Sequence, residues 1–122
     1  MSSRPKTARR RAAVEFSGAQ TLRQVQDAGG RLRAALAKGP DFDLRLSKVT
    51  DADLSFVQLV EAARAQAAAA GGRLALAAPA RGRLLEVLEL GGFLGPADPD
   101  RTAFWTGQGA QTEGAQTEGA KT

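Results

Sequence analysis

The run DLRLSKVTDADLSFVQLVEAARAQAAAA, residues 43–70, decides the fold of this chain. Its first part alternates apolar and polar residues from Leu44 to Ser47, which is typical of a half-buried strand. A polar turn at residues 50–53 follows. The remainder repeats apolar residues every three or four positions, which predicts a helix with one core-facing side (Phe56, Leu59, Val60, Ala63 and Ala67).

The start of this helix is the first candidate site. Ser55 is followed three residues later by Gln58, which is the spacing of a capping box. The first N–H groups of a helix have no partners within it and lie at the positive end of its dipole, so this position suits either a capping hydroxyl or a phosphate. Two interpretations therefore stay open: Ser55 only caps the helix, or it is a phosphoacceptor.

Two further strand–helix units flank the central one. Residues 14–16 are expected to form a strand, and residues 21–36 a helix with one apolar face (Leu22, Val25, Leu32 and Leu36). Gly29–Gly30 predicts a bend or break in the middle of that helix. Residues 73–77 are expected as a third strand and residues 80–90 as a third helix, with Leu84, Val87 and Leu88 inward. This alternation predicts an α/β fold with a parallel sheet.

One charged residue indicates how the helices cover the sheet. Arg45 stands between Leu44 and Leu46 in the central strand. A parallel sheet covered on both faces is usually built from continuous apolar runs, so an arginine here indicates that one face is largely open. The helices are therefore expected mostly on the other face.

The segment from Val49 to Leu59 (VTDADLSFVQL), followed by GGRLAL at residues 71–76, resembles the STAS family, the domain of sulphate transporters and anti-sigma factor antagonists. In that register Asp53 takes the family's aspartate position and Ser55 the phosphoacceptor position. Leu54 stands where the family has a small residue, and Phe56 where it has glycine. The resemblance implies a (βα)n superhelix with a mainly parallel, four-stranded sheet and helices mostly on one face. The family usually has one strand before residue 14, where this chain has only a basic leader.

Composition shifts divide the chain into four parts. Residues 1–13 are a basic leader, expected to be flexible, and residues 14–95 are the STAS-like domain. Residues 96–106 are a turn-rich connector whose Phe104–Trp105 pair either docks on the domain or anchors a partner. Residues 107–122 repeat GAQTE and are expected to be disordered.

The residues needed for most enzyme chemistry are missing from the sequence. It contains no histidine and no cysteine, and it has no Walker loop, GxGxxG motif or nucleophile elbow. We therefore expect no enzyme, cofactor or metal site. No apolar run approaches the roughly 18 residues that a membrane span needs, so a cytoplasmic location is expected. The positive charge is concentrated in the leader, and nucleic acid is not expected as a partner.

Two functions remain open, and both act through a protein partner. The resemblance to anti-sigma factor antagonists implies a regulatory module in which a partner serine kinase, the anti-sigma factor, phosphorylates Ser55. The alternative is an accessory subunit of a larger bacterial complex, for phospholipid transport or beside chemotaxis proteins, with no phospho-switch. In both cases the partner-binding residues are expected at the helix start (Asp51, Asp53, Leu54 and Phe56). A phenyl ring at Phe56 would obstruct a kinase and so favours the accessory subunit, whereas retention of Ser55 favours the switch.

Overall fold

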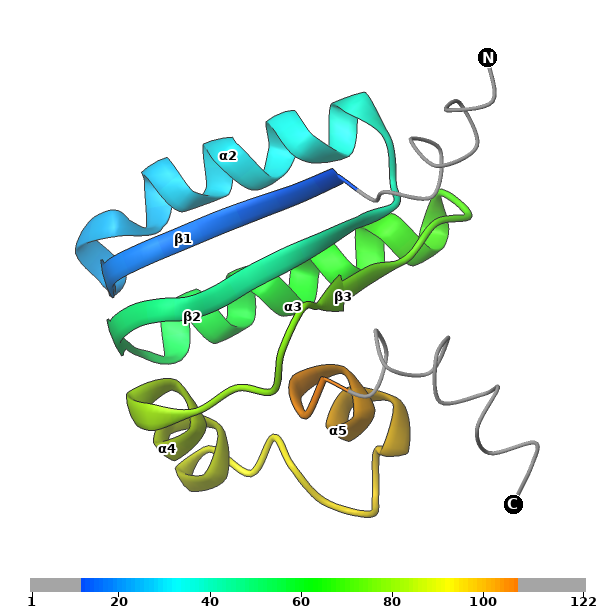
Figure 1. Cartoon of the computed structure of the whole chain (residues 1–122). Helices are drawn as coiled ribbons and strands as arrows, with labels where there is room; N and C mark the ends of the chain where they lie inside the picture. The colour runs from blue at the N-terminus through cyan, green and yellow to red at the C-terminus, as the bar shows by residue number, and fades with distance from the viewer. Residues whose placement is uncertain (1–11, 108–122) are drawn as a thin grey trace, which may run out of the picture.

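The computed structural model describes residues 12–107 of the chain (Figure 1). They form three strands, four α-helices and one short 3-10 helix: β1 (Ala12–Gln20), η1 (Leu22–Gln24), α2 (Val25–Lys38), β2 (Phe42–Ala52), α3 (Leu54–Ala69), β3 (Leu74–Leu76), α4 (Gly82–Leu90) and α5 (Pro99–Trp105). No helix within residues 12–107 is long and apolar enough to cross a bilayer.

The sheet is parallel, as the alternation of strands and helices predicts. Its strand order is β1-β2-β3, with Val14 opposite Leu44 and Phe42 opposite Leu74. The three described strands account for the expected sheet except for the additional N-terminal strand of the family. That strand would fall within residues 1–11, which lie outside the described residues, as do residues 108–122 of the GAQTE tail.

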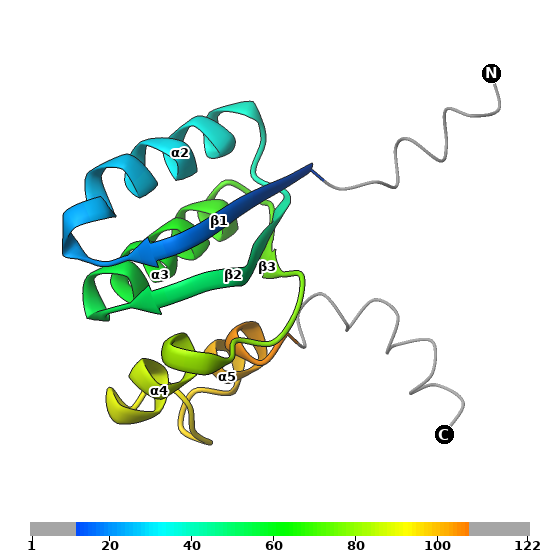
Figure 2. The same cartoon turned by 60° about the vertical axis from the view of Figure 1, so that its left-hand side comes forward.

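The two faces of the sheet differ as Arg45 predicts. Leu44 is fully buried, whereas Arg45 is exposed. Figures 1 and 2 show α2 and α3 on the same side of the sheet, with α4 and α5 beyond β2 and β3. On the open face an exposed ion pair joins Lys48 of β2 to Glu15 of β1, with 3.8 Å between nitrogen and oxygen. Such a pair contributes little to stability.

Helix α2 differs from expectation at its glycine pair. The helix runs from Val25 to Lys38 without a break at Gly29–Gly30. Gly29 is buried against α3, where a Cβ would lie 3.5 Å from Leu59 Cδ1. The contact between α2 and α3 stabilises a helical conformation that glycine disfavours in isolation, which explains why the helix does not bend here.

The core continues beyond residue 95 into α5. Phe104 is 4% exposed and Trp105 is 1% exposed, and both belong to the same hydrophobic core as the strands. The Trp105 Nε1–H donates to Glu61 Oε2 of α3 at 2.6 Å, and the Ala80 N–H donates to the Trp105 carbonyl at 2.9 Å. Of the two alternatives for the Phe104–Trp105 pair, docking on the domain is the one observed.

Candidate functional site

Helix α3 begins two residues earlier than a Ser55 cap requires. Strand β2 continues to Ala52, so the expected four-residue turn is reduced to Asp53 alone. Asp53 is the N-cap: its Oδ1 accepts from the N–H groups of Ser55 at 3.1 Å and Phe56 at 3.4 Å. The prediction that Ser55 caps the helix is wrong, because a carboxylate two residues before it already occupies the first free N–H groups.

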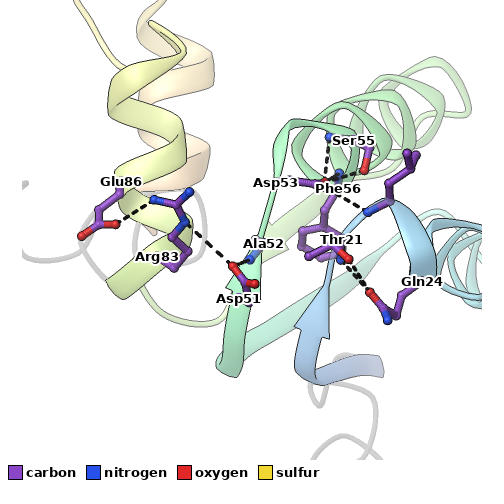
Figure 3. Close-up of polar contacts among 10 residues, drawn as sticks. Thr21, Gln24, Asp51, Ala52, Asp53, Ser55, Phe56, Arg83 and Glu86 are labelled. Carbon is purple, nitrogen blue, oxygen red and sulfur yellow. Dashed lines mark hydrogen bonds and ion pairs between the residues drawn. The ribbon is translucent and has the colours of Figure 1, made fainter.

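The Ser55 side chain lies within this cap. It is half-buried, and its Oγ–H donates to Asp53 Oδ1 at 2.5 Å (Figure 3). A charge-assisted hydrogen bond of this kind is stronger than one between neutral groups. The Asp53 carboxylate therefore orients the hydroxyl of the candidate phosphoacceptor.

Asp53 also holds the turn that follows the neighbouring strand, β1, at the same end of the sheet. Its second oxygen, Oδ2, accepts from the Leu22 N–H at 2.9 Å, although the two residues are 31 positions apart. The Leu22 side chain is 66% exposed, so its predicted place on the core face of a helix is wrong. Leu22 lies in η1, before α2 begins, and the hydrogen bond to Asp53 fixes it at the surface.

The sequence contains a signal for this turn that the predicted helix over residues 21–36 obscured. Thr21 and Gln24 have capping-box spacing, and the Gln24 Oε1 accepts from the Thr21 N–H at 2.9 Å and from the Thr21 Oγ1–H at 2.8 Å (Figure 3). The Gln24 N–H in turn donates to the Thr21 carbonyl at 2.8 Å. The turn is thus closed by its own hydrogen bonds.

Phe56 belongs to the core and not to the predicted partner-binding surface. It is 1% exposed, and its ring packs edge-on against Phe16, with centroids 5.6 Å apart and planes at 76°. The third position of α3 faces the sheet, so the side chain has no surface to offer a partner. The argument that its ring would obstruct a kinase therefore fails.

Asp51 and Leu54 remain at the surface beside Asp53. Asp51 Oδ1 lies 3.8 Å from Arg83 Nε of α4, and Arg83 Nη1 lies 3.1 Å from Glu86 Oε1 (Figure 3). These groups are about half exposed, so they contribute to the shape and charge of the surface more than to stability.

An open groove of about 300 Å³ separates the start of α3 from α4. It is lined by residues of both helices and of the turns that flank them (Asp53, Leu54, Arg83, Val87, Leu90 and Gly91). Within residues 12–107, no group of three or more His, Cys, Asp or Glu side chains could hold a metal ion.

Three exposed leucines lie near Asp53, and we call them the leucine surface. Leu22, Leu54 and Leu90 are 66%, 45% and 82% exposed, and they are the exposed large hydrophobic residues of the described chain. The Leu22 N–H donates a hydrogen bond to Asp53, whereas Leu54 and Leu90 line the groove together with Asp53. Exposed apolar side chains that gather in one place are typical of interaction sites. Sequence reasoning found Leu54 but missed Leu22 and Leu90, which only the fold brings near it.

Burial and hydrogen bonding act in opposite directions on Asp53. Burial raises the pKa of its carboxyl, but the hydrogen bond from the Ser55 side chain and those from the backbone N–H groups of Leu22, Phe56 and Ser55 lower it. The hydrogen bonds dominate, and the pKa of Asp53 lies below its ordinary value. The carboxylate is therefore ionised at neutral pH.

Asp53→Asn is expected to destabilise the fold in a pH-dependent way. The folded-state pKa of Asp53 is lowered, so its ionised form stabilises the native state fully above the unfolded-state pKa of about 4, and this stabilisation is lost as the pH falls through the folded-state value. Urea unfolding of the wild type and of Asp53→Asn should give a larger difference in the free energy of unfolding at pH 7 than at pH 3. Asp98→Asn, the same change at the cap of α5, is the control. A difference that does not change with pH would contradict this account.

The helices and the parallel sheet define a small α/β domain. Residues 3–95 match the family model described as "Mlab, STAS domain", which covers most of the chain. The chain belongs to the STAS domain family. No curated protein and no solved structure matches it. STAS domains are in general non-enzymatic interaction modules, and this membership supports a regulatory module of the anti-sigma factor antagonist-like class.

Proposed function

We propose that the chain is a phospho-switched interaction module whose partner docks on the leucine surface and whose partner kinase modifies Ser55. The observation that carries the proposal is the hydrogen bond from Ser55 Oγ to Asp53 Oδ1. It places the candidate phosphoacceptor beside a fixed negative charge, next to the exposed Leu54.

The switch would act through charge. A phosphate carries about −1.5 to −2 charges at pH 7, and at Ser55 it would lie beside the Asp53 carboxylate and near Asp51. A partner that covers the leucine surface must remove water from this region, and unpaired negative charge in a desolvated contact opposes binding. The unmodified form therefore binds the partner, and the phosphorylated form releases it.

Ser55→Ala and Ser55→Asp are expected to diverge in partner binding. The alanine variant should retain the partner, because the leucine surface is unchanged, whereas the aspartate variant should bind it at least about tenfold more weakly. Affinity capture from the native cell, with quantification of the recovered proteins, measures the difference. Ser47→Asp adds the same charge at an exposed position of β2 and is the matched control.

The expected pattern is one protein that is recovered with the wild type, Ser55→Ala and Ser47→Asp but lost with Ser55→Asp. Mass spectrometry of the chain from its native cell should find phosphate on Ser55. Equal recovery with the alanine and aspartate variants, together with no phosphate on Ser55, would retire the switch.

One observation favours the accessory subunit as a second candidate. The leucine surface is exposed in the unmodified chain, so a partner can reach it without any modification of Ser55. A constitutive partner in a larger bacterial complex could cover it permanently. In that case Leu54→Asp should abolish recovery of the partner, while both Ser55 variants retain it.

A further inference from the structure

A single carboxylate connects the candidate phosphoacceptor to a second part of the interaction surface. Asp53 Oδ1 accepts from the Ser55 hydroxyl at 2.5 Å, while Asp53 Oδ2 accepts from the Leu22 N–H at 2.9 Å. Figure 3 shows Asp53 between the start of α3 and the turn that follows β1. Any displacement of this carboxylate therefore affects both segments.

We propose that Asp53 is a coupling residue that transmits the phosphorylation state of Ser55 to Leu22. The inference rests on the proposed function, in which Ser55 is the phosphoacceptor. With Ser55 unmodified, Asp53 tethers the turn at Leu22 to the start of α3. With Ser55 phosphorylated, Asp53 leaves this position and the tether is lost.

The chemistry of the modification explains the displacement. A kinase transfers the γ-phosphoryl group of a nucleoside triphosphate to Ser55 Oγ: the Oγ–H bond is replaced by an Oγ–P bond, the proton leaves, and the nucleoside diphosphate is released. The donor in the bond to Asp53 Oδ1 no longer exists, and an anion stands in its place. Two anionic groups cannot share a contact of hydrogen-bond length without strong repulsion, so the carboxylate moves away.

The start of α3 can tolerate the loss of its cap, whereas the turn at Leu22 loses its tether, because water takes the place of the Asp53 carboxylate at the exposed Leu22 N–H. A phosphate on Ser55 can accept from the first N–H groups of the helix in place of Asp53. Among the described residues, Asp53 is the only hydrogen-bond acceptor of the Leu22 N–H. The turn itself stays closed by the bonds between Thr21 and Gln24, so it is released as a unit. Leu22, the part of the leucine surface that lies outside the groove, then changes position.

Amide hydrogen exchange in the isolated full chain tests this coupling. Phosphoserine incorporated at position 55 should speed exchange at the Leu22 N–H about five- to tenfold, the effect of losing one hydrogen bond. Ser55→Ala, which removes the hydroxyl but adds no charge, should change it less than about twofold. The Ala80 N–H, bonded to the Trp105 carbonyl, is an internal reference that should not change.

Asp53→Ser separates coupling from helix capping. Serine caps a helix well, but its single short side chain cannot reach both the helix start and Leu22. Exchange at the Leu22 N–H should therefore already be fast in Asp53→Ser, and phosphoserine at position 55 should add less than about twofold. Asp98→Ser, the same change at the cap of α5, should leave Leu22 as in the wild type.

The outcomes distinguish this inference from the proposed function. Unchanged exchange at Leu22 with phosphoserine at position 55 would overturn the coupling, even if the charge still releases the partner. Faster exchange in phosphoserine chains that is independent of Asp53 would overturn it as well. Faster exchange that requires Asp53 would support the coupling, and the absence of phosphate from Ser55 in the native cell would then count against the proposed function alone.

Discussion

Trp105→Ala is expected to lower the free energy of unfolding by about 3–5 kcal/mol, although Trp105 lies ten residues beyond the segment that matches the STAS family. The side chain is 1% exposed, and its ring packs edge-on against Phe104 with centroids 5.0 Å apart. Its removal leaves a cavity between α5, α3 and β3 and also removes the donor to Glu61. A loss of this size should lower the melting temperature by at least about 10 °C.

A second variant separates the volume of the ring from its hydrogen bond. Trp105→Phe keeps much of the packing but leaves Glu61 Oε2 without the indole N–H, so it should cost less, about 1.5–3 kcal/mol. Glu61 retains Arg64 at 3.7 Å and Arg101 at 3.4 Å, which limits the loss. If neither variant changes the free energy of unfolding, α5 is not part of the core.

Trp105 is the only tryptophan of the chain, and its fluorescence provides an independent check. If α5 unfolds together with the sheet, tryptophan fluorescence and far-ultraviolet circular dichroism should give coincident urea transitions. A fluorescence change that precedes the loss of helix signal would indicate that α5 detaches first. Coincidence would place the C-terminal boundary of the folding unit after residue 105 and not at residue 95.

The order of elements follows from patterns within short segments, which is why the sequence predicts it. Alternation around Leu44 and the spacing from Phe56 to Ala67 depend on the geometry of one strand and one helix. Arg45 predicts the open face because burying an unpaired guanidinium would be costly. The STAS resemblance and the parallel sheet are both confirmed.

The details of the site depend on contacts that no single segment contains. Asp53 and Ser55 are both good capping residues. Asp53 is the residue that caps α3, and it also accepts a hydrogen bond from the Leu22 N–H, 31 positions earlier in the chain. Leu90 joins the candidate surface only because α4 packs beside the C-terminal half of β2. The docking of Phe104 and Trp105 similarly depends on the half-buried acceptor Glu61 in α3.

Phe56→Ala is expected to lower the free energy of unfolding by about 3–5 kcal/mol, an effect similar to that of Trp105→Ala. Phe56 lies in the first turn of α3. Phe56 is 1% exposed and meets Phe16 of β1 edge-on, so its ring joins the first turn of α3 to the sheet. Alanine at this position leaves the Asp53 cap in place but removes the packing beneath it. Urea unfolding at pH 7 measures the loss.

Leu90→Ala is the matched control for this substitution. Leu90 is 82% exposed, and its truncation should change the free energy of unfolding by no more than about 0.5 kcal/mol. The pair of variants separates the core beneath the site from the surface above it. If Phe56 were a partner contact, its truncation would leave stability unchanged and weaken only partner binding. A stability loss with Phe56→Ala alone would instead show that the residue at the family's glycine position packs beneath the helix start, which leaves the surface above it to exposed side chains such as Leu54 and Leu90.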